Sequence, residues 1–320
     1  MLELADEPRS IVPNLESDLE ERYLSASGEE VVLSLDPHRL FQGPASTIFT
    51  AGNIVVKYQS DCLDDTGLHP LVREFYFLTL LAPLQIAPAP MYLSGPIRDA
   101  PEMAKTGFTN GSCLLNPEAT IRFLVMEKLG LSIYRFLLMR EELGLGKLSV
   151  PDAVGLGAQL LRLLQELHAL SIVHGDIHFG NVVFGPEGEL RLIDFGLAEI
   201  AEDSADADAP PLTSLIYHQY LSPWEMEGAQ ASIKSDIFRA VQIVAILVCG
   251  LDWERRAYQM AISPGLLQQQ LYVLKKSGNM FPLVKACPAD PGRHLFRAQQ
   301  LANQERPITE IIATLESAGT

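Results

Sequence analysis

Short apolar runs fill the first part of the chain, and turn residues separate them. The runs are rich in Val, Ile, Phe and Thr, and Gly, Pro, Asn or Asp stand between them at 36–37, 43–44 and 52–53. Alternation of this kind is typical of antiparallel strands. The predicted strands cover 31–33, 40–41, 47–50, 54–56, 87–93 and 121–126. We therefore expect a small antiparallel sheet here.

Apolar residues at three- and four-residue spacing predict helices elsewhere. The first predicted helix covers 70–81, and its apolar face consists of Leu71, Phe75, Leu78 and Leu81. A leucine-rich helix begins after Ser149, where S-V-P-D resembles a capping box. Short strands at 182–184 and 190–193 follow, and everything after Asp236 is predicted to be helical. A strand-rich front and a helical back indicate an α+β protein with two lobes.

Composition and charge exclude several classes of protein. Of the 320 residues 48% are hydrophobic and 20% charged, which is typical of a globular chain. The longest apolar run, 240–251, is interrupted by Gln242 and is too short to span a bilayer, so we expect a buried helix. The net charge is −16. An acidic surface repels phosphate backbones and anionic lipids, so we expect no nucleic-acid and no membrane partner.

The cysteines and the N-terminus bear on the compartment. The four cysteines are Cys62, Cys113, Cys249 and Cys287, and none forms a C-x-x-C pair. We therefore expect neither a metal cluster nor a disulfide framework, and a reducing compartment. The N-terminus is acidic and lacks the apolar segment of a secretory signal. The sequence predicts a soluble intracellular protein and carries no signature of its oligomeric state.

The strongest chemical signal lies in two neighbouring strings. Residues 173–181 read V-H-G-D-I-H-F-G-N, and D-F-G follows at 194–196. This spacing resembles the protein-kinase family, in which H-R-D-x-x-x-x-N precedes D-F-G. The resemblance implies that Asp176 orients and deprotonates the acceptor hydroxyl, and that Asn181 and Asp194 hold Mg²⁺ against the phosphates of ATP.

Lys57 ends the run I-V-V-K, which resembles the V-A-I-K strand of the same family. It is the only lysine among the first 104 residues. The resemblance implies that Lys57 holds the α- and β-phosphates and that a glutamate of the next helix is its partner. Glu74 is the candidate, although it could instead lie on a solvated helix face and pair with Arg73.

Three later features extend the resemblance over about residues 40–315. The string S-P-W-E ending at Glu225 looks like the A-P-E element with one residue inserted. Asp236 opens the long apolar helix, as a buried aspartate does beneath the catalytic loop of the family. Arg306, before Pro307 and the last helix, stands where the family keeps an arginine that pairs with the A-P-E glutamate.

Residues 123–133 resemble the hinge of the casein kinase 1 and vaccinia-related kinase branch. That likeness implies that the backbone of Glu127 and Leu129 meets adenine and that Met126 guards the pocket. It is also the ground for expecting Ser/Thr rather than Tyr acceptors.

The departures from the family keep other functions open. The phosphate loop at 42–47 has one glycine, Gly43, and Pro44 lacks an N–H group. Gly175 replaces the arginine that normally binds activation-loop phosphate, and His178 replaces a lysine. His178 is either a local hydrogen-bonding residue or a sign of a small-molecule phosphotransferase, resembling aminoglycoside and choline kinases. The altered loop also suits a pseudokinase that acts as a binding scaffold.

We predict an N-terminal extension over 1–38 and a protein-kinase-like domain over 39–320. Its small antiparallel β lobe covers 39–127, and its larger, mainly helical lobe covers 128–320. Residues 98–120 are expected to form an inserted surface loop. The predicted function is ATP- and Mg²⁺-dependent phosphorylation of Ser or Thr on protein substrates. Because Gly175 cannot bind a phosphate, we expect no need for activation-loop phosphorylation. The acidic segment 199–208 is either a solvated stretch or a segment that favours basic substrates through its negative potential.

Overall fold

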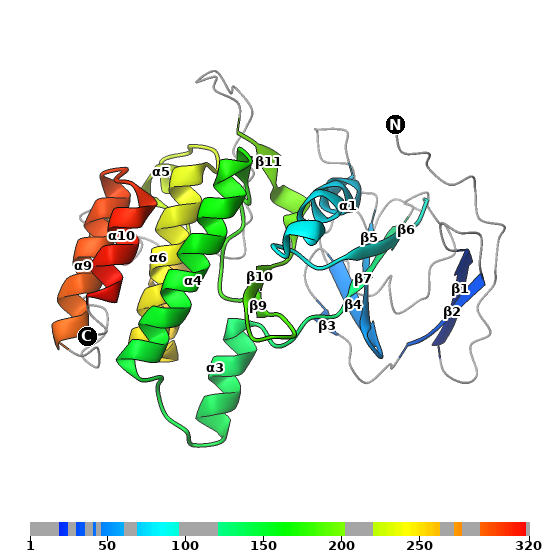
Figure 1. Ribbon diagram of the computed structural model, residues 1–320, viewed down its shortest axis with the longest axis horizontal. Coiled ribbons are helices and arrows are strands. Elements are labelled where there is room, and N and C mark those ends of the chain that lie inside the picture. The colour runs from blue at the N-terminus through cyan, green and yellow to red at the C-terminus, as the bar shows by residue number, and fades with distance from the viewer. Residues whose placement is uncertain are drawn as a thin grey trace. The chain divides into compact units, whose positions relative to one another are not determined.

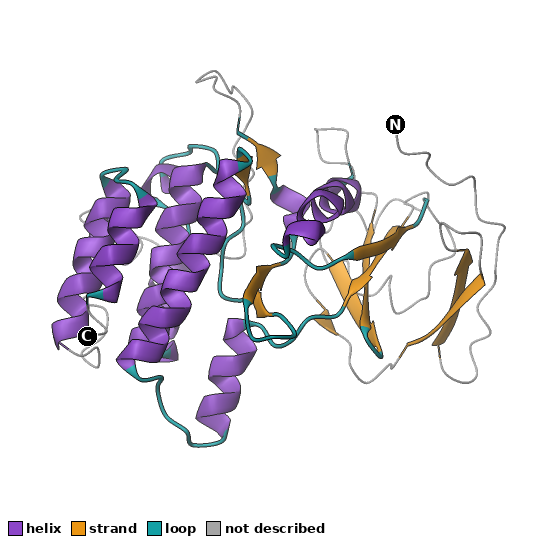
Figure 2. Ribbon diagram, viewed as in Figure 1, coloured by secondary structure: helices purple, strands orange, loops and turns teal. Residues whose placement is uncertain are grey.

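The computed structural model describes residues 19–24, 30–35, 41–42, 46–60, 69–95, 121–201, 220–262, 272–276 and 289–317. The chain forms two compact units, Met1–Leu129 and Gly130–Thr320 (Figure 1). Strands dominate the described part of the first unit and helices that of the second (Figure 2). The predicted α+β composition is confirmed. The separation of 1–38 as an extension stays a prediction.

The first unit is built on a five-stranded antiparallel sheet with the order β3-β4-β5-β7-β6. These strands are β3 (Phe41–Gln42), β4 (Ser46–Ala51), β5 (Ile54–Ser60), β6 (Pro90–Leu93) and β7 (Ile121–Glu127). Strands β1 (Leu19–Leu24) and β2 (Glu30–Leu35) form a separate antiparallel hairpin. The ring of Tyr58 lies 5.4 Å from those of Phe49 and Phe123, and all three rings are buried. The predicted antiparallel sheet is confirmed, with β6 beginning three residues later than its apolar run.

Helix α1 (Pro70–Leu81) covers the residues that its spacing predicts. The ring of His69 caps it by accepting a hydrogen bond from the Leu71 N–H at 3.1 Å. The helix packs on β6 and β7 and continues into the 3₁₀ turn η2 (Ala82–Leu84). Glu74 lies on its buried side with Leu71, Leu78 and Leu81. Burial of this apolar face therefore places a carboxylate inside the first unit.

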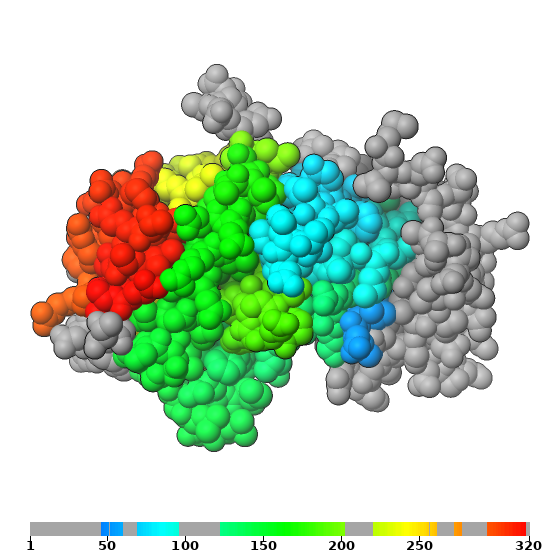
Figure 3. All heavy atoms as spheres, in the orientation of Figure 1, coloured from blue at the N-terminus to red at the C-terminus, as the bar shows by residue number. Residues whose placement is uncertain are grey.

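The second unit is organised around a pair of long helices. They are α4 (Val150–Ala169) and α6 (Ile233–Cys249), which pack against each other. The remaining helices are α3 (Ile133–Glu142), α5 (Pro223–Met226), α7 (Leu251–Ile262), α9 (Ala289–Asn303) and α10 (Ile308–Glu316). Helix α10 lies against both α4 and α9, and Figure 3 shows the three as one continuous surface. The predicted helical second half is confirmed.

Short strands carry the loops of the second unit. Strand β8 (Ile172–Val173) pairs with β11 (Glu199–Ile200), and β9 (Val182–Phe184) forms a hairpin with β10 (Leu190–Leu192). The 3₁₀ turn η3 (Phe195–Leu197) follows β10. Ser149 caps α4 by accepting from the Asp152 N–H at 3.3 Å. Asp152 does not return a bond to the Ser149 backbone but accepts the Ser149 hydroxyl at 2.6 Å, so the predicted capping box is only half formed.

Two expectations about α6 need correction. The predicted apolar run 240–251 is buried, but it spans two helices, because Gly250 adopts φ +86° and ends α6 before Leu251 begins α7. Cys249, the last residue of α6, is disulfide-bonded. The other three cysteines lie outside the described residues, and so does the partner of Cys249. The sequence predicted no disulfide framework, and it did not predict this disulfide of Cys249.

Several predictions fall outside the described residues. They concern Gly43 and Pro44, the inserted loop at 98–120 and the acidic positions 202–208. Among the helices that the structure does describe, none has the length and apolar character needed to cross a membrane.

Candidate active site

Lys57 and Glu74 form a buried ion pair in the first unit. Lys57 lies on β5 and Glu74 on α1, and Lys57 Nζ is 2.8 Å from Glu74 Oε2. The two side chains are only 6% and 2% exposed. Removing either partner would leave an uncompensated buried charge, which is strongly destabilising. The predicted pairing is present, and the alternative that Glu74 lies on a solvated face is wrong.

The predicted hinge residues lie at the end of β7. The Glu127 N–H donates to the Ala89 carbonyl at 2.8 Å, and the Glu127 carboxylate accepts the Ala89 N–H at 3.2 Å. Met126 is buried beside them in the strand. The Leu129 N–H, just beyond the strand, has no hydrogen-bond partner among the described residues. It is therefore a backbone donor that a ligand can use.

Asp236, in the first turn of α6, holds the backbone of the loop that follows β8. Its carboxylate accepts from the N–H groups of His174 at 2.8 Å and Gly175 at 3.1 Å, and lies 3.2 Å from His168 Nε2. Burial alone would raise the pKa of Asp236, but the hydrogen bond with His168 and the neighbouring histidines lower it below its ordinary value. The predicted position of Asp236 beneath this loop is confirmed.

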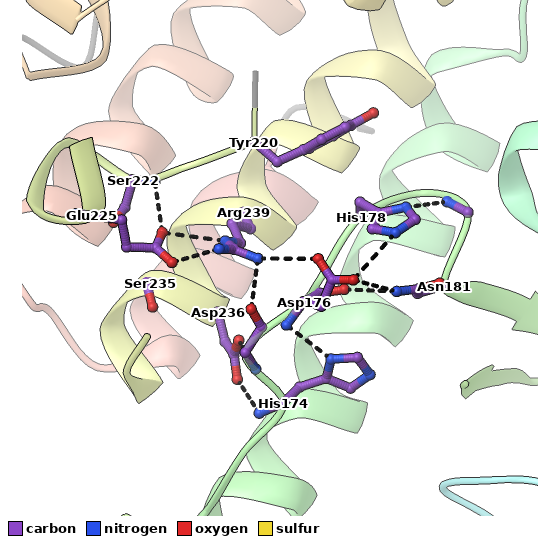
Figure 4. Close-up of polar contacts among 12 residues, drawn as sticks. His174, Asp176, His178, Asn181, Tyr220, Ser222, Glu225, Ser235, Asp236 and Arg239 are labelled. Carbon is purple, nitrogen blue, oxygen red and sulfur yellow. Dashed lines mark hydrogen bonds and ion pairs between the residues drawn. The ribbon is translucent and has the colours of Figure 1, made fainter. Parts of the chain in front are cut away.

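Asp176 and Asn181 lie at opposite ends of the same loop and contact each other. Asn181 Nδ2 donates to Asp176 Oδ2 at 3.2 Å and to the Asp176 carbonyl at 3.0 Å (Figure 4). Burial raises the pKa of Asp176 to about 6, against the effect of Arg239, and the charge of Asp194 adds to the rise. Because the Asn181 amide nitrogen is engaged, Oδ1 is the atom that this side chain offers to a cation.

Asp194 has a left-handed backbone, with φ 65° and ψ 67°. This conformation is uncommon outside glycine and persists where the surroundings enforce it, often at functional sites. Carboxylate and amide oxygens are the ligands that Mg²⁺ prefers, so Asp194 and Asn181 fit a Mg²⁺ site. No cluster of three or more His, Cys, Asp or Glu that could hold a metal occurs among the described residues, so phosphate oxygens would have to complete the coordination.

The two histidines of the loop are neutral and locally bonded. His174 Nδ1 accepts the Asp176 N–H at 3.2 Å, and Nε2 donates to the Ile193 carbonyl at 3.1 Å. His178 Nδ1 accepts the Gly180 N–H at 3.0 Å, which leaves the proton on Nε2, 3.7 Å from Asp176 Oδ2. Burial lowers the pKa of both rings, that of His178 to about 4. The interpretation of His178 as a local hydrogen-bonding residue is confirmed.

Arg239 of α6 joins the catalytic loop to α5. Its guanidinium makes an ion pair with Glu225 through two nitrogens, the Nε bond being 3.2 Å long (Figure 4). Arg239 Nη1 donates to the Gly175 carbonyl at 2.9 Å and lies 3.6 Å from Asp176 Oδ1. Glu225 also completes a capping box with Ser222, whose N–H donates to Glu225 Oε2 at 2.8 Å. One buried arginine thus contacts two carboxylates and a loop carbonyl.

This cluster corrects the prediction for Arg306. The sequence places Arg306 opposite Glu225, but Arg306 is half exposed and pairs with Glu310, in the first turn of α10, at 2.9 Å. Glu225 pairs with Arg239 instead, 14 positions away. Nearby, the buried Lys275 donates to the Leu221 carbonyl.

Sequence reasoning missed Arg239 and Lys275. Arg239 did carry a signal, because it stands three positions after Asp236 in an otherwise apolar stretch. Residues three apart share a helix face, so an arginine there follows the aspartate toward the loop. Lys275 carried no comparable signal, since a second lysine and a polar segment follow it directly in the sequence.

Comparison with known proteins finds similarity to protein kinases. The family described as the protein kinase domain matches residues 120–282, about half of the chain. The serine/threonine-protein kinase PknA of Mycobacterium tuberculosis is 32% identical over 132 residues, 40% of this chain and 28% of that protein. The serine/threonine-protein kinase PknK of the same species is 28% identical over 170 residues, 51% of this chain and 14% of that protein. A probable serine/threonine-protein kinase of Corynebacterium efficiens is 28% identical over 131 residues, 41% of this chain and 19% of that protein.

The matched segments span less than a third of each of these relatives. With the family match, the predicted protein-kinase-like α+β fold is confirmed. The buried Asp236, the contact between Asp176 and Asn181 and the left-handed Asp194 all lie within the matched segment. The chain belongs to the protein kinase domain family.

Proposed function

We propose that this protein is an ATP- and Mg²⁺-dependent protein kinase that phosphorylates Ser or Thr hydroxyls. The main support is that Asp176 contacts Asn181 and lies close enough to Asp194 to feel its charge. Phosphoryl transfer needs a base for the acceptor hydroxyl next to the metal ligands. The serine/threonine kinases among the relatives support the choice of acceptor. The hinge likeness to the casein kinase 1 and vaccinia-related kinase branch agrees with it.

Each residue has a defined part in the proposed reaction. Asp176 orients the acceptor hydroxyl and takes its proton as the oxygen forms a bond to the γ-phosphorus, while the bond from the γ-phosphorus to the β–γ bridging oxygen breaks and ADP leaves. Asn181 and Asp194 would hold Mg²⁺, which neutralises phosphate charge when it is bound. Lys57, fixed by Glu74, binds the α- and β-phosphates. The adenine contacts are the backbone of Glu127 and Leu129, with Gly43 in the phosphate loop.

The proposal extends to regulation and substrate choice. Gly175 has no side chain with which to bind an activation-loop phosphate, so the enzyme is active without one. Acidic residues at 199–208 favour basic protein substrates through a local negative potential.

The Asp176→Asn substitution tests the mechanism. An amide accepts no proton, so we expect turnover to fall by about 10²- to 10⁴-fold, the usual contribution of a general base. Nucleotide binding should remain, because the substitution acts on the acceptor. Phosphate transfer to a generic basic protein measures the first effect. The rise in unfolding temperature with Mg·ATP measures the second, since ligand at a hundred times its Kd stabilises by about 2.7 kcal/mol.

Asp152→Asn is the matched control, because Asp152 lies on the exposed first turn of α4. It should keep the activity of the parent protein. Undiminished phosphorylation by Asp176→Asn would refute the role of Asp176. Turnover of small hydroxyl compounds without transfer to proteins would replace the proposal with a small-molecule kinase. A parent protein that Mg·ATP does not stabilise would replace it with a scaffold.

A further inference from the structure

Arg239 is buried at the centre of the charged cluster in the second unit. Its side chain is 6% exposed, and its guanidinium contacts Glu225, Asp176 and the Gly175 carbonyl. Figure 4 shows it between the carboxylates of Glu225 and Asp176, which come from α5 and from the catalytic loop. A buried guanidinium is retained only where its donors are satisfied, and this one has acceptors on two separate segments.

The geometry of Gly175 explains why the cation comes from α6. Gly175 adopts φ +78°, and a Cβ atom on it would lie 2.7 Å from the Leu197 carbonyl oxygen. No side chain fits there unless the segment after Asp194 moves. Position 175 therefore has no arginine side chain. The guanidinium of Arg239 instead reaches the Gly175 carbonyl and the Asp176 carboxylate from α6.

We propose that Arg239 is a positioning residue for the phosphoryl-transfer reaction, a permanent clamp that fixes the Asp176 carboxylate and ties it to the α5 segment. The inference rests on the proposed function and gives its phosphate independence a physical basis. A phosphate-dependent kinase must acquire a charge in its activation segment before the catalytic loop is ordered. Here both partners are side chains of the folded chain, so the link exists as soon as the second unit folds.

The planar fork of the guanidinium is essential to this role. It binds the Glu225 carboxylate in a bidentate manner and still directs Nη1 toward Gly175 and Asp176. A lysine carries the same charge on a single nitrogen and cannot span these acceptors at once. The clamp therefore predicts that Arg239→Lys is defective although the charge is conserved.

The experiment compares Arg239→Met and Arg239→Lys with Arg306→Met, all in full-length, phosphatase-treated protein. Arg306 is the matched control, because its exposed pair with Glu310 lies outside the cluster. Hydrogen exchange of the peptides that contain 174–181 and 220–226 reports the clamp directly. We expect faster exchange in both Arg239 variants and no change in Arg306→Met.

Steady-state kinetics supplies the second measurement. Misplacement of a catalytic group by about 1 Å can cost 10²-fold, so we expect kcat to fall on that order in Arg239→Met, with KM for ATP near that of the parent. Arg239→Lys should fall in the same direction. If Arg239→Met does not fold, Arg239→Lys carries the comparison, since it keeps the buried charge paired.

The outcomes separate the clamp from the proposed function. Unchanged exchange and kcat in a folded Arg239 variant would overturn the clamp. Loss of turnover on phosphatase treatment of the parent would also overturn it, because a phosphate group would then be needed to order the catalytic loop. If the parent phosphorylates no protein but the Arg239 variants still exchange faster than the parent, the clamp is supported and the kinase assignment is refuted.

Discussion

Lys275 lies fully buried in the interior of the second unit. Its Nζ donates to the Leu221 carbonyl and lies 6.0 Å from the centre of the Phe238 ring. The pKa of Lys275 falls from 10.5 to about 7, mainly because of burial; the charge of Glu225 opposes the fall, and that of Arg239 adds to it. The folded protein therefore favours the neutral amine.

This residue predicts a pH dependence of stability. Between about pH 7 and pH 10 the unfolded lysine binds a proton that the folded one releases, so its contribution to the free energy of unfolding increases as pH rises. Below that window the charge is buried and destabilising. Lys275→Met removes the charge, so we expect it to raise the unfolding temperature relative to the parent more at about pH 6 than at about pH 9.

Lys276→Met is the control for this comparison. Lys276 is exposed and paired with Glu227, an interaction that raises its pKa, so it is charged in both states over this range. Thermal unfolding monitored by circular dichroism gives the difference in unfolding temperature between each of the two variants and the parent at each pH. A shift that is equal at both pH values for Lys275→Met would show that Lys275 does not titrate as burial predicts.

At the scale of elements, periodicity located helices but not the contacts between them. The bounds of α1 follow from the spacing of its apolar residues, because one face packs on the sheet. The break between α6 and α7 was missed, since Gly250 stands inside the apolar run 240–251 and only its positive φ reveals the helix end. The close approach of α4 to α6 was also not predicted, because a glycine within a helical sequence does not indicate which helix packs against it.

Gly157 permits that approach. A Cβ atom on it would lie 2.7 Å from Cγ2 and 2.9 Å from Cγ1 of Val244 on α6. Valine has few rotamers in a helix, so the helices would have to separate. Overpacking costs about 1–3 kcal/mol, which exceeds the gain of about 1 kcal/mol from replacing a helical glycine with alanine. We therefore expect Gly157→Ala to destabilise the protein, as measured by urea unfolding.

Gly155→Ala supplies the opposite expectation on the same helix. Gly155 is exposed, and a Cβ there meets nothing within 4 Å. Only the backbone preference remains, so the variant should be more stable by about 0.5–1 kcal/mol. If both substitutions stabilise equally, the helices are not in close contact at Gly157.

At the scale of the whole molecule, the sequence points to the proposed catalytic residues more directly than to the contacts between distant elements. Asp176, Asn181 and Asp194 stand at a spacing that the chemistry itself demands, so a linear pattern reveals them. The partner of Glu225 depends on which helix passes beneath α5, and that is a tertiary fact. Arg306 matched the family position, yet Arg239 lies closer in space. The pair of Lys57 and Glu74 was predictable because its two residues lie on consecutive elements, the strand β5 and the helix α1.

The net charge of −16 leads to a prediction about substrates. A negative potential near the acceptor site raises the local concentration of basic peptides and repels acidic ones. The contributing residues are Glu202, Asp203, Asp206 and Asp208, which lie outside the described part of the chain. We expect their joint replacement by the corresponding amides to lower the ratio of kcat/KM for a basic over an acidic peptide on the order of tenfold at low salt.

The control removes four exposed carboxylates elsewhere in the second unit, by Glu→Gln at Glu142, Glu166, Glu187 and Glu316. It changes the net charge equally, so a general field effect would lower the ratio in both proteins, whereas local steering would lower it mainly in the first. The Debye length is about 8 Å at physiological ionic strength, so local steering should also weaken as salt rises. Equal ratios in the parent and the first variant at every salt concentration would reject steering by this segment and leave substrate choice to direct contacts.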